Sequence, residues 1–452
     1  MSSQNLRIHT VVYDPPPVVT AASANGRYLV DQYGTGIIPQ FDTLWAMVQQ
    51  AGNTALNGGS ATWQQDVDFW ISSRAGQGWN GLKFNLLGNT ASGTPNADGR
   101  TFDTKYPFGS TVGGTAFGNP SAGLASDYWT RVDYLIDQAA ASGMTCFAFV
   151  FETDDLAGSN VMSNGAGTVK ALSEFQAYGT ALGNRYKTKT NIVWCVGADY
   201  FDNELTKVEG TIDSLRAAGD SHLFTVENWV DLANHHWTTS RKSDTGTTQQ
   251  LGTDRATLNG SYIYEPTYLA AAAAWVETPT IPAILIDGYY EAGADALTLR
   301  RNTAHSLTYG APGAHFGSEA NWAMPSGWRT QVGTPPASMG HLVKIRQAIA
   351  GYPRWPDLVP DTGSTFLTAG RSSGTTFVTG SKTADGKYAV IYMPNAATTL
   401  TVDTTQMVAS YTATWVDPAS GATVAGTPGT TFSRGTANSD GGADWLLVLK
   451  EP

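Results

Sequence analysis

The chain has 452 residues, of which 41% are hydrophobic and only 14% are charged, and its formal net charge is −11. The hydrophobic fraction, with 14 Trp and 19 Tyr, excludes general disorder, and the length allows two or three domains with a large core. The negative charge argues against nucleic acid and anionic membranes as partners, because phosphate binding requires a basic surface. Many aromatic and neutral polar residues with few charges favour an extracellular protein that handles sugars.

The two cysteines, Cys146 and Cys195, each lie inside an apolar, strand-like run. Buried free thiols are therefore expected, and a disulfide framework is excluded by count. No run of eighteen apolar residues predicts a membrane-spanning helix. Residues 1–5 lack the basic segment and apolar core of a secretory signal. An extracellular, surface or virion-associated location is favoured by the composition, although no signal peptide is evident in this numbering.

The N-terminal region begins with residues 1–25, which are polar and then proline-rich and predict an extended arm. Residues 27–42 follow as a predicted hairpin that turns at residues 34–36. The hairpin leads into Asp42, which is suited to cap a first helical turn.

Helical and strand-like patterns then alternate along the chain. Apolar spacing and capping residues predict helices over residues 63–75, 169–186, 204–218, 295–309 and 337–350, one that Asp127 caps and Gly143 ends, and an alanine-rich helix after residue 265. Apolar runs predict strands over residues 81–87, 144–151, 191–198, 222–227, 261–265, 282–287 and 313–317. Such alternation is typical of parallel βαβ units.

These patterns predict an α/β fold, a (β/α)8 TIM barrel over residues 26–355. A doubly wound open sheet is the alternative, but no Gly-x-Gly-x-x-Gly loop follows the first strand. After residue 355 short β-rich runs recur with turns between them. They predict a small antiparallel β-sandwich domain over residues 356–452.

Two of the predicted barrel strands end at a carboxylate, Asp199 after residues 191–198 and Asp287 after residues 282–286. Parallel barrels keep their catalytic residues at the carboxyl ends of the strands. Paired carboxylates perform general acid/base chemistry on glycosidic bonds. Each acid on its own is equally well explained as a helix cap or an ion-pair partner.

Several motifs together resemble the apiosidase-like catalytic domain of glycoside hydrolase family 140. They are residues 41–45 (FDTLW), 77–80 (QGWN), 128–137 (YWTRVDYLID), 185–186 (RY) with 191–194 (NIVW), 197–199 (GAD) and 285–291 (LIDGYYE). Residues 416–421 (VDPASG) resemble a turn of the small β domain, labelled collagen-binding, that often follows it. The resemblance covers residues 26 to about 450. It implies hydrolysis of glycosidic bonds in complex polysaccharides, with release of apiose from pectin as the named activity of the family.

The resemblance also implies that Asp199 is the acid/base and that its partner comes from the end of the seventh strand. The family has Glu where this chain has Asp287, which is one methylene shorter and reaches about 1.5 Å less far, whereas catalytic geometry tolerates about 0.5 Å. Three alternatives follow: the backbone compensates for Asp287, Glu291 is the working carboxylate, or catalysis is lost. Asp287 and Glu291 rank equally as the second carboxylate.

Further residues at strand ends are candidates for substrate binding. They are Asp42, Trp45, Asn85, Glu227, Glu265, Trp229 and Trp322. Asp42 is equally suited to be a helix cap, carboxylates such as Glu227 and Glu265 are more often hydrogen-bonded wall residues, and the tryptophans suit core packing as well as sugar stacking. The pair His235-His236 lacks partner ligands at metal-binding spacing, so neither a metal nor a cofactor is expected.

A glycoside hydrolase that acts on a polysaccharide or oligosaccharide is therefore the first hypothesis. The alternative is a non-catalytic carbohydrate-binding or structural module of a larger assembly, such as a virion or cell surface, on the same scaffold. The missing signal peptide, the N-terminal arm and the change from Glu to Asp favour this alternative somewhat. The sugar, the linkage, the stereochemical outcome and the oligomeric state are not determined by the sequence.

Overall fold

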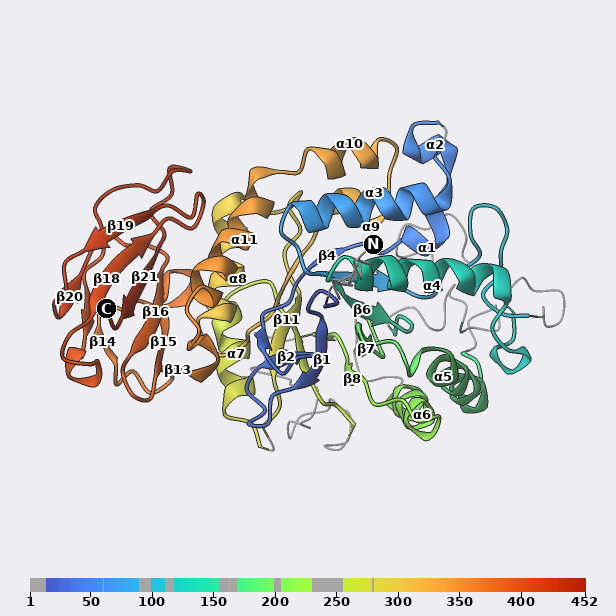
Figure 1. Cartoon of the computed structure of the whole chain (residues 1–452), viewed down its shortest axis with the longest axis horizontal. Helices are drawn as coiled ribbons and strands as arrows, with labels where there is room; N and C mark the ends of the chain where they lie inside the picture. The colour runs from blue at the N-terminus through green and yellow to red at the C-terminus, as the bar shows by residue number, and fades with distance from the viewer. Residues whose placement is uncertain are drawn as a thin grey trace, which may run out of the picture.

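The computed structural model describes residues 14–59, 61–88, 99–109, 118–153, 162, 169–198, 205–229, 255–278 and 280–452. It contains a parallel β-sheet surrounded by helices, followed by a smaller antiparallel β domain at one end of the molecule (Figure 1). In this part of the chain, no helix is long and apolar enough to cross a lipid bilayer.

The parallel sheet has the strand order β8-β7-β6-β5-β4-β12-β11-β10-β9. Its strands are β4 (Gln40–Thr43), β5 (Gly81–Asn85), β6 (Thr145–Phe149), β7 (Ile192–Cys195), β8 (Leu223–Thr225), β9 (Asn228–Trp229), β10 (Asn259–Tyr262), β11 (Ala283–Asp287) and β12 (Ala314–Phe316). Strands β8 and β9 are successive pieces of one run, so the two ends of the sheet meet. The sheet is therefore nearly closed into a barrel of eight strand positions, which confirms the predicted fold.

Helices cover the outside of this barrel. They are α1 (Met47–Gln50), α2 (Thr54–Asn57), α3 (Trp63–Gly76), α4 (Ser126–Ala141), α5 (Leu172–Tyr186), α6 (Leu205–Ala217), α7 (Thr267–Trp275), α8 (Ala296–Leu307), α9 (Glu319–Trp322), α10 (Trp328–Gly333) and α11 (Ala337–Ala350). Thr62 and Gln65 form a reciprocal capping box at the start of α3. The prediction that Asp127 caps α4 was wrong: the helix begins one residue earlier, at Ser126, and the Asp127 carboxylate lies 3.1 Å from Lys105 Nζ.

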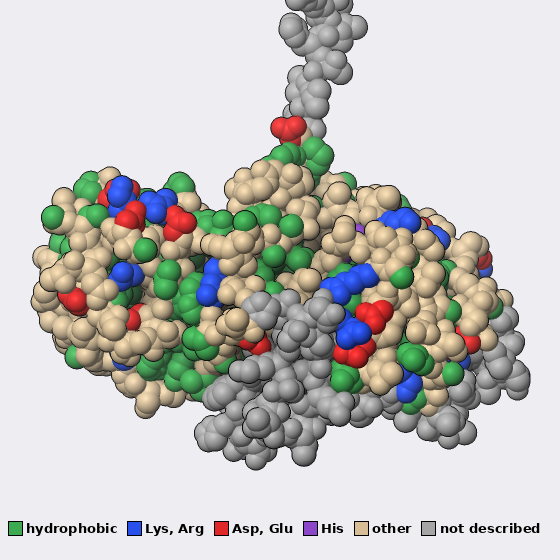
Figure 2. Space-filling model, turned by 90° about the horizontal axis from the view of Figure 1, so that it is seen from below, with side chains coloured by type: hydrophobic (Ala, Val, Ile, Leu, Met, Phe, Trp, Pro, Cys, Tyr) green, Lys and Arg blue, Asp and Glu red, His purple; other side chains and the backbone are tan. Residues whose placement is uncertain are grey.

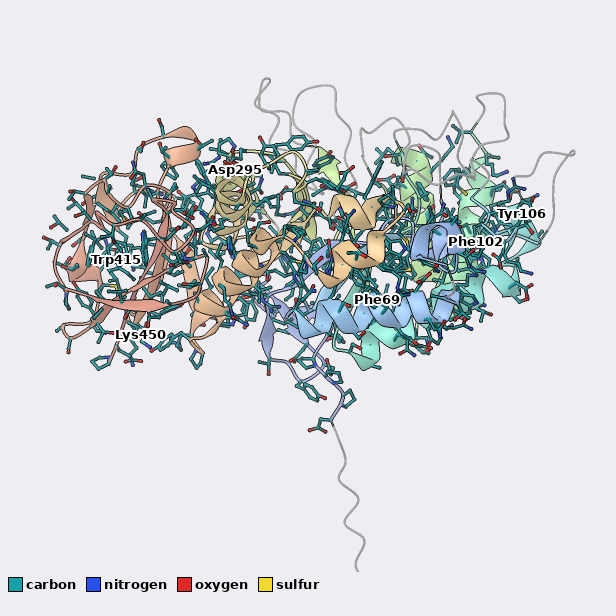
Figure 3. The ribbon with its side chains drawn as sticks, turned by 90° about the horizontal axis from the view of Figure 1, so that it is seen from above. Phe69, Phe102, Tyr106, Asp295, Trp415 and Lys450 are labelled. Carbon is teal, nitrogen blue, oxygen red and sulfur yellow. The ribbon has the colours of Figure 1, made fainter. Side chains whose placement is uncertain are left out.

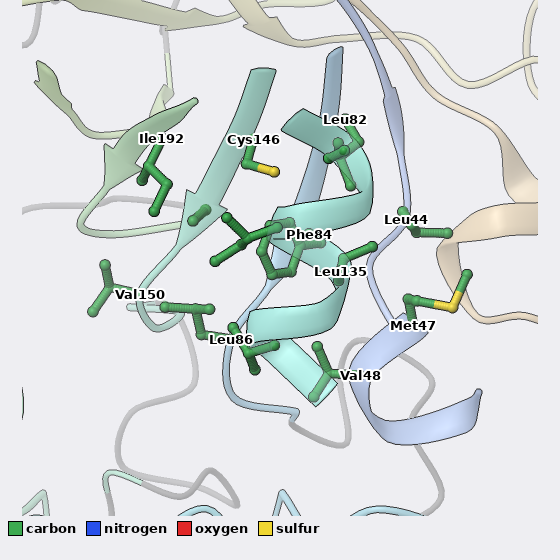
Figure 4. Packing of buried hydrophobic residues seen from close by; sticks show 14 of the residues in the cluster. Leu44, Met47, Val48, Leu82, Phe84, Leu86, Leu135, Cys146, Val150 and Ile192 are labelled. Atoms are coloured by element: carbon green, nitrogen blue, oxygen red, sulfur yellow. The ribbon is translucent and has the colours of Figure 1, made fainter. Parts of the chain in front are cut away.

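The main core lies between the strands and the helices. Side chains alternate between the two faces of a strand, so Leu82 and Phe84 of β5 point outward and meet Leu135 of α4 and Cys146 of β6 (Figure 4). A second apolar cluster fills the barrel interior and includes Phe41, Phe147, Phe149, Val193 and Ile284. Both Cys146 and Cys195 are buried free thiols, as predicted.

A small antiparallel sheet packs against the interior of the barrel. It consists of β1 (Val19–Ala22), β2 (Leu29–Asp31) and β3 (Gly36–Ile37), and it contains the predicted hairpin turn. Val19 and Leu29 are fully buried in the interior cluster, and the Val19 amide donates a hydrogen bond of 2.9 Å to the Thr145 hydroxyl. Regular structure therefore begins within the segment predicted as an arm. Residues 1–13 lie outside the described part of the chain.

The C-terminal domain is an antiparallel sandwich. One sheet is formed by β13 (Leu358–Pro360), β15 (Thr379–Thr383), β16 (Tyr388–Met393), β21 (Trp445–Lys450), β18 (Thr412–Val416) and β19 (Thr423–Gly426), and the other by β14 (Leu367–Ala369), β17 (Leu400–Val402) and β20 (Thr431–Phe432). An apolar core that includes Leu367, Ile391 and Trp415 lies between the two sheets. The larger sheet packs its other face against the barrel through a shared cluster with Ile345 and Ile349 of α11. Figure 2 shows hydrophobic side chains gathered at this junction.

Candidate active site

Strand β5 carries two polar side chains into the barrel. Because Leu82 and Phe84 face the helices, the alternation of the strand directs Lys83 and Asn85 inward. Both side chains are fully buried. Burying a charge costs free energy unless the charge is paired. The partners of Lys83 therefore show which other charged residues lie inside the barrel.

Lys83 binds two carboxylates from the ends of distant strands. Its ammonium forms an ion pair with Asp287 of β11, and it lies 3.3 Å from Glu227 Oε1, two residues after β8. Burial lowers the pKa of Lys83, but the charges of Asp287 and Glu227 outweigh burial and leave the pKa raised. Burial also raises the pKa of Asp287, but the charge of Lys83 and the side-chain hydrogen bonds with Glu227 and Lys83 outweigh burial, so the pKa of Asp287 is lowered. Asp287 is therefore ionised and Lys83 protonated at neutral pH.

A buried histidine lies on the other side of Asp287. His315 Nε2 of β12 is 3.4 Å from Asp287 Oδ1, and the Gly288 amide donates a 2.5 Å hydrogen bond to the same oxygen. Burial lowers the pKa of His315 to about 3, so its imidazole is neutral at physiological pH. Asp287 is thus held by one cation and one backbone amide, with a neutral ring beside it.

A second polar cluster surrounds Glu152, which follows β6. Its Oε1 accepts hydrogen bonds from Trp45 Nε1 at 2.6 Å and from Asn85 Nδ2 at 2.8 Å. Glu152 is only 4% exposed. The structure therefore brings together Trp45 and Asn85, two predicted binding residues, through Glu152, which directly follows the strand predicted over residues 144–151.

Asp42 lies in the wall of the barrel. Its Oδ2 accepts hydrogen bonds of 2.6 Å from Arg74 Nε of α3 and from Asn321 Nδ2 of α9. Burial raises the pKa of Asp42 to about 6, although Arg74 acts in the opposite direction. This carboxylate is fully buried between the strand and the helices. The predicted contact between Asp42 and a substrate therefore stays a prediction, and the packing does not support it.

Two further predicted acids, Glu265 and Glu291, are only partly buried. Glu265 forms an ion pair with Arg301 of α8, as expected for a paired wall residue. The Glu291 carboxylate accepts hydrogen bonds of 2.9 and 2.8 Å from the backbone amide of Glu319. Burial raises the pKa of Glu291 to about 7, although these hydrogen bonds act in the opposite direction. Glu291 is thus poised to hold or release a proton near neutral pH.

This raised pKa predicts a pH dependence of stability. The folded-state pKa of Glu291 lies above the value of about 4.3 for an unfolded chain, so the folded protein holds this proton more tightly. The contribution is complete below pH 4.3 and is lost as the pH rises to about 7. We expect the difference in unfolding free energy between wild type and Glu291→Gln, measured by urea denaturation, to decline across this window. A constant difference would contradict the assignment.

Aromatic side chains lie at the ends of β10 and β11. The hydroxyl groups of Tyr262 and Tyr264 lie 3.0 Å apart, and the rings of Tyr264 and Tyr289 have centroids 5.0 Å apart. Tyr264 is 39% exposed. Tyr289 lies in the motif at residues 285–291, but none of the three tyrosines was predicted as a binding residue, although they lie at strand ends as Asp287 does.

Of the two tryptophans predicted to bind sugar in the strand-end loops, the structure describes the side chain of Trp322 but not that of Trp229. Trp322 of α9 is partly buried against the interior apolar cluster, and its carbonyl accepts a 3.1 Å hydrogen bond from the Ala46 amide. Only the backbone of Trp229 is described, in β9. Asp199 and the pair His235-His236 lie outside the described residues, so their predicted roles stay predictions. Within the described ranges, no group of three or more His, Cys, Asp or Glu side chains is arranged to hold a metal ion.

Comparison with known families identifies the barrel. The sequence profile of the apiosidase-like catalytic domain matches residues 23–365, which is most of the chain. The chain belongs to the apiosidase-like family. A second profile, described as "Putative collagen-binding domain of a collagenase", matches residues 359–450 of this apiosidase-like protein.

Solved structures show the same architecture. A structure described as a glycoside hydrolase is 16% identical, with a TM-score of 0.74 over 96% of this chain and 97% of the other. A glycoside hydrolase family 5 structure from Bacteroides vulgatus is 17% identical, with a TM-score of 0.74 over 96% and 93% of the two chains. These similarities establish the fold of the apiosidase-like protein across both domains. No curated protein sequence matches the chain significantly.

Proposed function

We propose that this protein is a glycoside hydrolase that cleaves an O-glycosyl bond in a complex polysaccharide with two carboxylates. The observation that carries the proposal is the ionised Asp287, held by Lys83 at the carboxyl end of β11. Barrels of this kind have their catalytic residues at that end of the strands. Membership of the apiosidase-like family supports the same reaction class.

The two carboxylates have different tasks in this reaction. Glycoside hydrolysis requires one acid that protonates the leaving oxygen and one carboxylate that stays ionised to attack the anomeric carbon or to activate water. Asp287 suits the ionised role, because Lys83 disfavours its protonation. Asp199, at the end of the run that contains β7, takes the acid/base role that the resemblance implies.

Glu291 is the alternative partner. Its pKa of about 7 makes it a weaker candidate for a permanently ionised carboxylate and a better candidate for proton transfer near neutral pH. Both of its oxygens are within hydrogen-bonding distance of the Glu319 amide, which fixes its orientation at the rim. We therefore assign the ionised role to Asp287. Glu291 is assigned a supporting position near the reacting bond, not the ionised role.

The aromatic residues at the strand ends supply binding surface for sugar rings. Tyr262, Tyr264 and Tyr289 combine ring faces with hydroxyl groups, which is the combination that suits a saccharide with apolar faces and polar edges. We propose that they contact the polysaccharide beside the reacting bond. The family name makes an apiose-bearing pectin the first substrate to examine.

The proposal is tested by product release from a panel of plant and bacterial polysaccharides, pectin included. Wild type is compared with Asp199→Asn, which removes the proposed acid/base but retains the side-chain size. We expect wild type to release sugar from at least one member and the variant to be slower by about 10²–10⁴-fold. Release that is equal in the two proteins would remove Asp199 from the mechanism. No release by either protein, with glycan binding intact, would favour the binding-module alternative.

A further inference from the structure

A cleft lies at the junction of the two domains, between helix α11 and the six-stranded sheet. It encloses about 340 Å³ and is bordered by α11, by strands β16, β18, β19 and β21, and by the turn after β18. Its lining includes Lys344, Tyr352, Thr414, Ser420, Thr423 and Lys450. The volume is within the range of about 300–1,000 Å³ found for small-molecule sites.

The floor of the cleft is apolar. Val416 and Val448 on neighbouring strands and the ring of Tyr388 form it, and each is less than 9% exposed. The Tyr388 hydroxyl donates a 3.0 Å hydrogen bond to the carbonyl of Ile349, which fixes the ring against the end of α11. Gly421 leaves room for the Lys344 side chain, because a Cβ at this position would lie 3.1 Å from it.

Two lysines from opposite walls give the cleft a positive charge. Lys344 extends from α11, and Lys450 lies at the end of β21 with its ammonium 5.7 Å from the centroid of the Tyr352 ring. Within the described part of the chain, neither ammonium forms an ion pair with a carboxylate. The nearby Glu451 is instead engaged by Lys387, 3.1 Å away, and by the Tyr352 hydroxyl, 2.9 Å away. In a chain of net charge −11, this cleft therefore favours an anionic ligand.

The cleft is remote from the candidate active site. Its lining residues come from α11, the turn after it and the C-terminal sheet, and none comes from the barrel strands that carry the site; Figure 3 shows Lys450 at the end of the molecule that the C-terminal domain forms. A ligand in the cleft is therefore not the sugar whose bond would be cleaved. It is a separate molecule or a distant part of the same polymer.

We propose that this cleft binds a carboxylated sugar unit of a polysaccharide, at a site separate from the reaction. The apolar floor suits the C–H face of a pyranose ring, and the hydroxyls of Thr414, Ser420 and Thr423 suit its hydroxyl groups. The two lysines suit its carboxylate. The inference goes beyond the proposed hydrolysis and does not depend on it, because the cleft and the candidate active site share none of these residues.

The test is calorimetric titration of the full chain with a short oligogalacturonide at low salt. A neutral galacto-oligosaccharide of the same length and a poly-glutamate peptide serve as comparison ligands. We expect the oligogalacturonide to bind and the affinity to fall with added salt. Lys344→Gln combined with Lys450→Gln should weaken binding by about tenfold or more. Thr423→Trp, at an exposed position on the rim, should block the cleft without changing the charge.

Two matched variants complete the design. Lys187→Gln removes an equal charge outside the cleft, and Asp287→Asn changes the candidate active site, so both variants, once circular dichroism shows that they are folded, should bind the oligogalacturonide as wild type does. Binding that survives both the double lysine change and Thr423→Trp would overturn the proposal, as would equal binding of the neutral oligosaccharide. Poly-glutamate that competes equally well would make this an acidic-peptide site instead. Loss of binding in Asp287→Asn alone would place the ligand at the barrel.

Discussion

Replacing Lys83 by methionine should both destabilise the protein and move its activity to higher pH. The ammonium is fully buried between Asp287 and Glu227, so its removal leaves two carboxylates facing each other without a counter-charge. Breaking a buried ion pair costs about 3–5 kcal/mol. Without the lysine the pKa of Asp287 rises, because burial and the neighbouring carboxylate both favour its protonated form. The acidic limb of the pH–activity profile should therefore shift upward, with kcat at acidic pH lower on the order of a hundredfold.

The matched control for this change is Lys83→Arg, which retains the positive charge on β5. It should keep the acidic limb near its wild-type position, even if the larger side chain lowers stability. Urea unfolding and pH–rate profiles of the three proteins separate the two effects. A Lys83→Met protein with the wild-type acidic limb would show that Lys83 does not set the charge of Asp287.

The second large effect is expected at the junction of the two domains. Arg300 of α8 is fully buried and forms hydrogen bonds of 2.9 Å from Nε and Nη2 to the two oxygens of Asp444, which precedes β21. Asp444→Asn leaves this guanidinium with a weakened partner in a buried environment. We expect a loss of about 3–5 kcal/mol in the free energy of unfolding, measured by chemical denaturation with a probe in each domain. The two probes should also report less coincident transitions.

Asp440 provides the control, because it binds the same arginine from a more open position. Its Oδ2 lies 2.6 Å from Arg300 Nη1, but its side chain is 36% exposed. Asp440→Asn should cost at most about 1 kcal/mol, as is usual for exposed ion pairs. Equal losses in the two variants would show that burial of the Arg300–Asp444 pair does not matter to the attachment of the β domain.

Local patterns predicted the fold well, because a barrel repeats one short unit whose signals lie within neighbouring residues. Helix α11 occupies residues 337–350 as its apolar spacing predicted, and β11 ends at the predicted Asp287. The strand predicted over residues 261–265 begins earlier, at Asn259, because its pairing with β11 starts there and Tyr264 already leads into the bend before α7. Pairing partners of this kind lie outside any local window.

The candidate site was predicted only in part, for the same reason. The strand ends indicated Asp287 and Glu227, but not that Lys83 joins them across 144 and 204 residues of sequence. A lone lysine in the run from Gly81 to Asn85 and a lone histidine in the run from Ala314 to Phe316 were the available signals. A charged or titratable residue inside an otherwise buried strand calls for a partner, and that rule would have selected both.

The most direct test of the proposed mechanism is the initial rate of hydrolysis by Asp287→Asn and by Glu291→Gln, on a glycan that wild type cleaves. Circular dichroism of both variants verifies that they are folded. The account predicts that Asp287→Asn lowers kcat by about 10²–10⁴-fold. It predicts that Glu291→Gln keeps the rate within about tenfold of wild type, because a residue beside the reacting bond contributes less than the ionised carboxylate. A folded Asp287→Asn protein that retains wild-type kcat would contradict the account.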